Sequence, residues 1–375
     1  MKETAIYIHI PFCDHKCIYC DFYSIINYDN VSSYLNALVK EIEIRGKEYS
    51  SDRKVGSIFF GGGTPSFMEP EYIGGIIKAV RDNFVVADDV EITLETNPGT
   101  VDEKKLKDFL STGINRISIG IQSFNDDELK FLTRIHNSET AVATVYAAEK
   151  AGFKNISIDL IFNLPNQTKE IWKSNLEKAV GLPITHISAY SLILEKGTIL
   201  NKMVLDGKVT MQDSDHDADL YELTIDYLFK NKFEQYEVSN FCLPGFECKH
   251  NNAYWRYKEY LGFGTSAHSF VNGKRWWNYS SLNFYLEKMK TDNPIAGEET
   301  LTSEQIHEEY FMLAMRSKGL DVNEYKNRFG KDWLEKKRDE IDKYAADGFL
   351  VIENNFIKFT SQGYALCDEI IAKLL

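Results

Sequence analysis

The sequence predicts an α/β protein, a partial (β/α)6 barrel of the TIM type followed by a mainly helical C-terminal domain. In the first half, short apolar runs alternate six times with longer segments of helical spacing. Serial β-α repeats of this kind predict parallel strands with right-handed crossovers. A closed eight-fold barrel needs ~250 residues, and the repeats fill only roughly the first 200. An open barrel therefore fits better than a closed one, although a doubly wound sheet would give the same linear pattern.

The six strands are expected where apolar and β-branched residues cluster: residues 5–10, 55–60, 90–94, 116–121, 155–162 and 186–194. The helices between them are expected where apolar residues recur at helical spacing: residues 34–48, 70–83, 102–111, 139–151 and 169–180. Asp102 has the character of a helix cap, and Gly113 and Gly152 have the character of helix stops.

Beyond about residue 200 the pattern changes. A helix is expected at residues 214–230, and an aromatic-rich stretch follows from Tyr236 to Tyr279. Further helices are expected at 303–316, 322–329 and 331–346, and two short strands at 349–352 and 356–359. Helices followed by a small hairpin resemble a winged helix. We therefore divide the chain into a barrel (1–235), an aromatic-rich connecting region (236–300) and a C-terminal packing or lid domain (301–375).

The composition argues against a nucleic-acid partner. Lys and Arg number 43 against 56 Asp and Glu, a net charge of −13. Such a surface repels phosphate backbones, and no basic cluster offsets it. No stretch reaches the roughly 18 apolar residues of a membrane span, and residues 1–10 are too short for a secretory signal before Pro11 and the first cysteines. We expect a cytoplasmic protein with reduced thiols.

Three of the six cysteines crowd one loop. Cys13, Cys17 and Cys20 follow the first predicted strand directly, in a C-x3-C-x2-C pattern. Thiolates are preferred ligands of both iron–sulfur clusters and zinc. Structural zinc usually takes four ligands, and His15 is available as the fourth in a zinc knuckle. The other solution is a cluster held by three cysteines, which leaves one iron open for chemistry.

Polar residues recur where the predicted strands end. The second strand leads into Gly61-Gly62-Gly63-Thr64-Pro65, the third ends at Glu95, the fourth at Gln122, and the fifth carries Asp159. Functional residues of such barrels lie at the carboxyl ends of strands, and buried polar groups are costly unless they are partnered. Each residue alone also fits a structural role as a turn, a strand stop or a paired carboxylate. Together they predict one shared ligand site.

These motifs resemble, in order and spacing, the radical SAM superfamily and, within it, the oxygen-independent coproporphyrinogen III oxidases and the related HemW heme chaperones. The resemblance covers nearly the whole chain, through Tyr7-x-His-Ile-Pro-Phe-Cys13, Gly61-Gly-Gly-Thr-Pro65, Glu95 with Asn97-Pro98, Ile121-Gln-Ser-Phe124, Leu132-Thr-Arg-Ile-His136, Asp159-Leu-Ile161 and Gly262-Phe-Gly-Thr-Ser-Ala-His268.

The resemblance implies a [4Fe-4S] cluster on Cys13, Cys17 and Cys20, with S-adenosylmethionine (SAM) at the fourth corner. In the superfamily the reduced cluster cleaves SAM to a 5′-deoxyadenosyl radical. The resemblance also implies a set of SAM-binding residues: Tyr7, Tyr19, Gly62, Gly63, Thr64, Glu95, Gln122, Arg134 and Asp159.

One position departs from the oxidase pattern. The oxidases carry a further cysteine two residues after the third, whereas this chain reads Cys20-Asp21-Phe22. Phe22 cannot ligate a metal, form a hydrogen bond or pass a hydrogen atom. The substitution speaks against coproporphyrinogen decarboxylation and favours the chaperone branch.

A second motif concerns heme. His250-Asn-Asn-Ala-Tyr254-Trp255 resembles the His-Asn-x-x-Tyr-Trp motif proposed as the heme site of those chaperones. Heme binding requires an axial ligand, commonly histidine, and aromatic faces that cover the ring. We predict His250 as the ligand, with Cys248 and His268 as rivals. The structural alternative is an aromatic core patch in which His250 bonds locally.

The predicted function is that of a cytoplasmic heme chaperone that binds heme, a [4Fe-4S] cluster and SAM. It would deliver heme to heme-requiring proteins such as those of the respiratory chain, with peripheral contact to membrane-bound acceptors. The first alternative is an oxygen-independent coproporphyrinogen III oxidase, with the cluster cysteines catalytic and His250 structural. The second is a radical SAM enzyme with another substrate.

Overall fold

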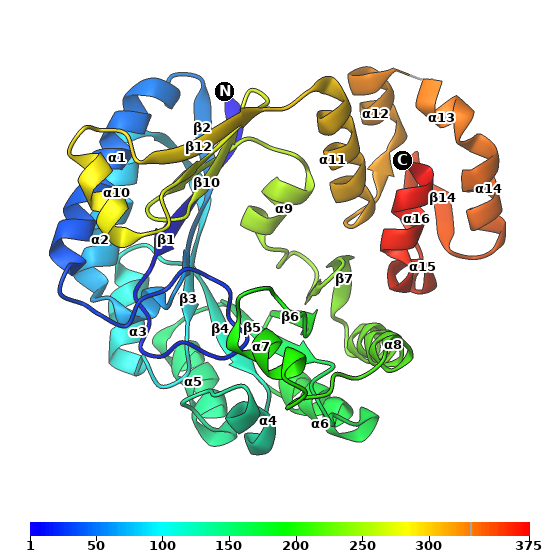
Figure 1. The fold of residues 1–375 in the computed structure, drawn as a ribbon, viewed down its shortest axis with the longest axis horizontal. Helices are drawn as coiled ribbons and strands as arrows, with labels where there is room; N and C mark the ends of the chain where they lie inside the picture. Colours follow the sequence, from blue (N-terminus) through cyan, green and yellow to red (C-terminus); the bar gives the residue numbers. More distant parts are fainter. Residues whose placement is uncertain (331) are drawn as a thin grey trace.

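The computed structural model describes residues 1–330 and 332–375. A curved sheet with helices on its outer face forms the larger part of the molecule, and a smaller helical domain lies beside it (Figure 1). The sheet has twelve strands in the order β12-β11-β10-β9-β1-β2-β3-β4-β5-β6-β8-β7.

The six predicted barrel strands form the centre of this sheet. They are β1 (Lys2–Ile10), β2 (Arg53–Gly62), β3 (Val85–Thr96), β4 (Arg116–Gln122), β5 (Asn155–Phe162) and β6 (His186–Ser191). Each pairs in parallel with the next in chain order. A doubly wound sheet would reverse its strand order at a switch point, and these six strands show no reversal. The partial barrel is confirmed.

The crossover helices cover the outer face of the sheet (Figure 1). They are α1 (Val31–Tyr49), α2 (Pro70–Asn83), α3 (Glu103–Ser111), α5 (Ser138–Ala151) and α6 (Lys169–Val180), with the short α4 (Asp126–Phe131) and the 3-10 turn η1 (Pro65–Phe67) between them. Asp102 caps α3 by accepting from the Lys105 backbone N–H at 2.7 Å. Gly152 ends α5 in the left-handed conformation, at φ 110°, as its position predicts.

The two faces of β4 differ: one faces the hydrophobic core, and the other faces the inside of the barrel. Ile117, Ile119 and Ile121 are fully buried in the hydrophobic core. Arg116 and Ser118 lie on the opposite face of the strand, because successive side chains alternate. They line cavities inside the barrel.

The connecting region extends both edges of the barrel sheet. After α7 (Ile199–Leu205) and α8 (Ser214–Lys230), β7 (Glu234–Glu237) and β8 (Asn240–Cys242) pair antiparallel beyond β6. At the other edge β9 (Tyr260–Phe263) runs parallel to β1. Three further elements complete that edge: β10 (His268–Val271), β11 (Lys274–Asn278) and β12 (Ile295–Thr300). Helix α9 (Lys249–Trp255) leads into β9, and α10 (Leu282–Met289) lies between β11 and β12.

The C-terminal domain has its own hydrophobic core. Its helices are α11 (Ser303–Met315), α12 (Val322–Phe329), α13 (Asp332–Lys336), α14 (Arg338–Ala346), α15 (Ser361–Ala365) and α16 (Cys367–Leu374). Its sheet has the order β13-β15-β14, from β13 (Leu320–Asp321), β14 (Leu350–Glu353) and β15 (Phe356–Phe359). The helix predicted for 331–346 begins at residue 331, outside the described residues, and the remainder forms α13 and α14. A backbone hydrogen bond of 2.9 Å links this domain to the region before it, with the Val238 N–H donating to the Arg316 carbonyl.

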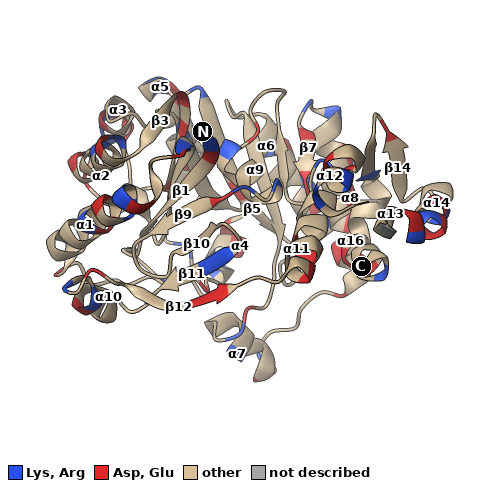
Figure 2. Cartoon of the chain, turned by 90° about the horizontal axis from the view of Figure 1, so that it is seen from above, with Lys and Arg blue, Asp and Glu red and all other residues tan. Residues whose placement is uncertain are grey.

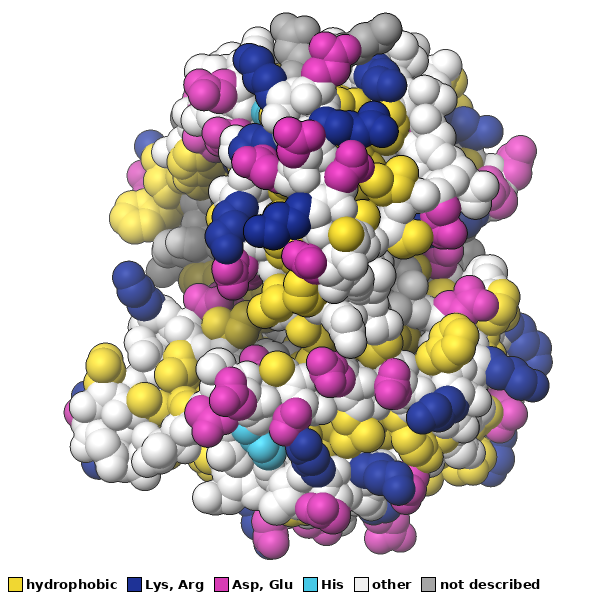
Figure 3. Space-filling view, turned by 90° about the vertical axis from the view of Figure 1, so that its right-hand side faces the viewer, with side chains coloured by type: hydrophobic (Ala, Val, Ile, Leu, Met, Phe, Trp, Pro, Cys, Tyr) yellow, Lys and Arg dark blue, Asp and Glu magenta, His cyan; other side chains and the backbone are white. Residues whose placement is uncertain are grey.

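Charges of both signs are interspersed over the molecule. Figure 2 shows Lys and Arg next to Asp and Glu along most helices. Figure 3 shows the same mixture on the side where the C-terminal domain lies, with apolar side chains between the charges. Within the described residues, no helix combines the length and the apolar character needed to cross a membrane.

Candidate functional site

The cysteine loop is tied down at both ends by backbone hydrogen bonds. The Cys13 N–H donates to the Ile25 carbonyl at 2.9 Å, and the Ile25 N–H donates to the Pro11 carbonyl at 2.8 Å. Cys13 and Cys17 are buried, Cys20 is partly exposed, and all three are free thiols. The three residues line one cavity of about 420 Å³ at the carboxyl ends of the barrel strands. The loop therefore presents three thiols to a common space.

Three thiols that share one cavity are the donor set of an iron–sulfur cluster. Among residues 1–330 and 332–375, no three His, Cys, Asp or Glu side chains converge as ligands of one ion. The thiolates of a cubane cluster bind different irons, so they need to share a cavity but not a point. The Arg134 guanidinium lies 3.7 Å from the Cys17 sulfur. Burial raises the pKa of Cys20 to about 11, so ligation has to displace this proton.

Of the residues predicted to bind SAM, Tyr19 on the cysteine loop and Arg134 line this cavity, and Tyr7 does not. A polar wall of the cavity comes from the predicted residues at the strand ends: Gly62, Gly63, Thr64, Glu95, Gln122 and Asp159. Their strands run in parallel, so their carboxyl ends meet at one edge of the sheet. The structure thus brings together residues that are spread over 140 positions from Tyr19 to Asp159.

The glycines after β2 allow a close approach between β2 and the cysteine loop. A Cβ on Gly63 would lie 2.5 Å from the Phe12 carbonyl oxygen. Gly62 has φ 110°, and a Cβ there would lie 2.6 Å from the His9 ring. The Gly63 and Thr64 N–H groups donate to the Ile10 and Phe12 carbonyls, both at 2.8 Å. Gly62 and Gly63 therefore have a structural role, because their lack of side chains lets the start of the cysteine loop pack against the end of β2.

Arg134 holds several parts of the cavity together. Its guanidinium donates to the Asn97 side chain at 2.7 Å and to the Gly120 carbonyl at 2.6 Å. Asn97 in turn donates to Thr64 at 2.8 Å, and the Thr64 hydroxyl lies 3.1 Å from the Cys13 sulfur. Gln122 follows a register shift between β4 and β5 and has φ 69°, a conformation that is uncommon outside glycine and that occurs at functional sites.

Two half-buried carboxyls, Glu95 and Asp159, belong to this wall. Burial, followed by the charge of Asp159, raises the pKa of Glu95 to about 8. Burial also raises the pKa of Asp159, although the Ser118 hydroxyl donates to this carboxylate at 3.2 Å. The Gly62 N–H donates to Glu95 at 3.3 Å. The two carboxyls thus offer oxygen atoms to hydroxyl or amine donors of a ligand.

Comparison with known proteins places this geometry in a family. The radical SAM superfamily model matches residues 7–179, and the HemN C-terminal domain model matches residues 301–366. The heme chaperone HemW of Lactococcus lactis is 35% identical over 100% of this chain and 98% of its own length. That of Bacillus subtilis is 33% identical over 99% of each chain. The chain belongs to the HemW family of radical SAM proteins.

A solved structure gives the same fold. Coproporphyrinogen III oxidase (HemN) from Escherichia coli superposes with a TM-score of 0.83 over 100% of this chain and 90% of that one, at 23% identity. At this identity the similarity concerns the fold alone. Radical SAM membership implies a [4Fe-4S] cluster and SAM as cofactors, and the cavity described above has the residues to hold both.

The HemW motif residue His250 lies in a second, inner chamber. This chamber, of about 220 Å³, contains Tyr7 and His250 and shares Glu95, Ser118, Asp159 and Tyr190 with the first cavity. His250 is buried, and both ring nitrogens are engaged: Nδ1 with the Ser57 hydroxyl at 3.1 Å and Nε2 with the Tyr254 hydroxyl at 3.0 Å. Burial lowers the pKa of His250 to about 3, so the ring is neutral. To bind iron, Nε2 must exchange the Tyr254 hydroxyl for the metal.

The two rival heme ligands differ in access. Cys248 is buried and caps α9, because its sulfur accepts from the Asn251 N–H at 3.5 Å. Burial raises the pKa of the Cys248 thiol to about 12. His268 is exposed on β10, and its ring stacks on Trp277 with centroids 5.8 Å apart.

The predicted set omits Arg116, which is buried and lines the inner chamber. Its Nε finds no hydrogen-bond partner within the described part of the chain. The alternation of residues in β4 could have revealed Arg116 from the sequence. One face of the strand carries Arg116, Ser118, Gly120 and Gln122, and the other carries isoleucines. A cation on the inward face of a barrel strand indicates a residue of the site.

Proposed function

We propose that this chain is a heme chaperone, which binds heme and passes it to heme-requiring proteins such as those of the respiratory chain. Its relatives named heme chaperones match it over its whole length. The protein would hold a [4Fe-4S] cluster on Cys13, Cys17 and Cys20. SAM would lie against the polar wall that extends from Gly62 to Asp159.

The chain's own residues prepare the cavity for these cofactors. A reduced cluster with SAM supplies radical chemistry when both are bound. Arg134 is placed to pair with a carboxylate, while its bonds to Asn97 and Gly120 fix the guanidinium. Glu95 and Asp159 offer acceptors for hydroxyl or amine groups, and Tyr19 closes the cavity beside the cysteines.

The observation that carries the proposal is Phe22. This residue lies at the cavity rim with 61% of its surface exposed, at the position where the resemblance expects a further cysteine in the oxidases. A phenyl ring offers no hydrogen atom, proton or ligand to a reaction in the cavity. The cavity would thus hold the proposed cofactor residues without the extra thiol that the resemblance implies for the decarboxylating enzymes.

For the heme itself we propose His250 as the axial ligand, reached when Tyr254 releases Nε2. Cys248 would have to leave its capping position and lose its proton, since burial raises its pKa. His268 needs neither change and is the first alternative. The spectrum of the heme complex distinguishes thiolate from imidazole ligation.

A transfer experiment tests the proposal. The full chain, with its cluster reconstituted under anaerobic conditions, is loaded with one equivalent of heme. It is then mixed with membranes that contain a heme-depleted respiratory oxidase. We expect a heme complex of 1:1 stoichiometry and recovery of the oxidase spectrum. Absence of heme binding by protein with a full cluster, or retention of all heme in the presence of the acceptor, would contradict the chaperone function.

A further inference from the structure

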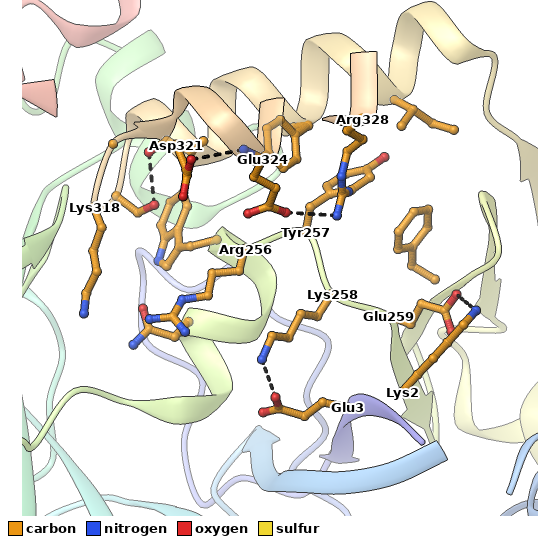
Figure 4. A pocket seen from close by; sticks show the side chains of 18 of the residues that line it. Lys2, Glu3, Arg256, Tyr257, Lys258, Glu259, Lys318, Asp321, Glu324 and Arg328 are labelled. Atoms are coloured by element: carbon orange, nitrogen blue, oxygen red, sulfur yellow. Dashed lines mark hydrogen bonds and ion pairs between the residues drawn. The ribbon is translucent and has the colours of Figure 1, made fainter. Parts of the chain in front are cut away.

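The cavity that contains the cysteines, here called the SAM cavity, differs at its edge from a second cleft. The cleft, of about 620 Å³, lies between the barrel and the C-terminal domain. Asn252 and Trp255 of α9 line it, whereas His250 and Tyr254 of the same helix line the inner chamber. Figure 4 shows three ion pairs of the cleft as dashed lines: Lys258 with Glu3, Lys2 with Glu259, and Arg328 with Glu324. The edge of the SAM cavity instead carries exposed apolar side chains.

Four of these exposed side chains make up the surface that we call the mouth patch: Phe22, Ile193, Ile199 and Leu205. Phe22 and Ile193 line the SAM cavity, and Ile199 and Leu205 are the two ends of α7. More than half of the surface of each residue is exposed. Figure 2 shows α7 projecting from the body of the molecule. Large apolar side chains that gather on a soluble protein mark a site of contact.

Helix α7 is attached to the cysteine loop by its inner side. The Leu200 N–H donates to the Ile18 carbonyl at 2.9 Å, and both side chains are buried in one apolar cluster. The outward side of α7 carries Ile199, Lys202 and Leu205, which are exposed and three residues apart. A helix that packs by one side usually presents polar residues to solvent. The outward side of α7 departs from this rule at both ends, beside the loop that carries the cysteines.

The charges around the SAM cavity balance one another. Residues 14–22 and 190–208 contain four lysines and four carboxylates: Lys16, Lys196, Lys202 and Lys208, with Asp14, Asp21, Glu195 and Asp206. An anionic lipid surface attracts segments with an excess of Lys and Arg, and these two segments have none. The net charge of −13 on the whole chain adds repulsion. The balance therefore favours an apolar area of another protein over a lipid surface.

We propose that the mouth patch is the docking surface for the protein that receives heme, through a near-neutral apolar area of that protein. The inference rests on the proposed function and deepens it by assigning the face at which the acceptor binds. The SAM cavity shares Glu95, Ser118 and Asp159 with the chamber that contains His250. A partner on the mouth patch therefore lies at the open side of the cavity next to the proposed heme ligand. Phe22, which offers the cavity neither a ligand nor a proton, serves this contact.

Association and heme transfer are measured separately. The probe is a heme-depleted respiratory oxidase purified in detergent, and it is mixed with the full chain that carries its cluster and one equivalent of heme. We expect the double variant Ile199→Glu/Leu205→Glu to weaken association and slow transfer at least about tenfold, since two apolar side chains are no longer buried. Phe229→Glu, at an exposed position on α8 outside the mouth patch, is the matched control and should stay within about twofold of wild type.

A salt series tests the chemistry of the contact. Salt screens contacts between charges and leaves apolar contacts largely intact. The affinity of the wild-type chain for the oxidase should therefore change less than about threefold between about 50 mM and about 500 mM NaCl. A steep loss of affinity over this range would contradict docking through a near-neutral apolar area.

Each other use of the mouth patch gives its own result. Lower heme or SAM affinity in the double variant would show that these side chains cover the ligands. Loss of binding to protein-free lipid vesicles would assign the patch to lipid, and loss of a wild-type dimer in sedimentation would assign it to a second copy of the chain. Any of these results, without a loss of association with the oxidase, would overturn the docking surface.

The two readouts separate this inference from the proposed function. Equal association and transfer in the double variant and in Phe229→Glu would overturn the docking surface and leave the chaperone function standing. Association that depends on the mouth patch, in a chain that never transfers its heme, would support the docking surface and contradict the function.

Discussion

The SAM cavity and the α9 motif differ in how far they are organised without their ligands. In the cavity, Arg134, Asn97 and Thr64 connect the cysteine loop to the strand ends through hydrogen bonds. In α9, the motif residues face two different spaces, and both nitrogens of His250 are engaged. Preorganisation lowers the cost of binding. We infer that the proposed cofactors would enter a prepared site, whereas ligation of heme iron by His250 would first require the hydrogen bond between His250 and the Tyr254 hydroxyl to break.

The largest expected effect tests the prepared site. Cys17→Ser should abolish the iron–sulfur absorbance after anaerobic reconstitution, because three thiolates are the minimum set on this loop. Iron content and visible absorbance provide the measurement. Cys367→Ser, at a buried thiol in the C-terminal domain, should retain the full cluster. An intact cluster in Cys17→Ser would refute the ligand assignment.

Asp159 tests the polar wall of the same site. Asp159→Asn keeps the shape of the side chain but removes the charge. We expect SAM affinity, measured by calorimetry on protein with a full cluster, to fall about ten- to a hundredfold, the effect of losing a hydrogen bond to a charged group. Unchanged SAM affinity would return Asp159 to a structural role as the acceptor of the Ser118 hydroxyl.

His250 tests the other side of the comparison. His250→Ala should shift the heme absorption spectrum and weaken heme binding about tenfold, while the cluster absorbance stays at the wild-type level. His268→Ala, which alters the exposed rival, is the matched variant. If His250→Ala leaves the heme spectrum and affinity unchanged and His268→Ala changes both, the ligand is His268. The hydrogen bond between His250 and Tyr254 then does not need to break.

The last prediction concerns the stability of the chain without cofactors, through Glu95. Its pKa is raised to about 8 by burial, so between about pH 4.5 and 8 the folded state holds a proton that the unfolded chain has released. Wild-type stability should therefore fall as pH rises through this window. Glu95→Gln removes this pH dependence, so urea unfolding should show the variant gaining on the order of 3 kcal/mol relative to wild type between pH 5 and pH 8. Parallel pH profiles of the two proteins would contradict the assignment.

The barrel could be predicted because its signals are local and repeated. Each strand from β1 to β6 contains a cluster of apolar and β-branched residues, and helices such as α2 and α6 have the predicted bounds. The cysteine loop and the strand-end residues follow from the same pattern, since parallel strands bring their carboxyl ends together. The strands β7 to β12 were not predicted, because strands of three to six residues such as Asn240–Cys242 are too short to show periodicity.

The two faces of α9 and the position of Tyr7 could not be predicted for a different reason. Both depend on tertiary contacts: Tyr7 lies beside Phe59 and His250, with ring centroids 6.4 Å from each. The C-terminal domain, which forms one wall of the cleft, packs beside α9 from about 50 residues further along the chain. The aromatic residues of the motif were visible in the sequence, but the side on which each lies was not.

The most direct test of the chaperone function is an anaerobic assay of reconstituted protein with SAM, a reductant and coproporphyrinogen III, followed by chromatography of the products. With Phe22 in place of the oxidase cysteine, we predict no decarboxylated product from protein that carries a full cluster and binds one equivalent of heme. A catalytic yield of protoporphyrinogen would show that Phe22 is tolerated and that the chain is an oxidase.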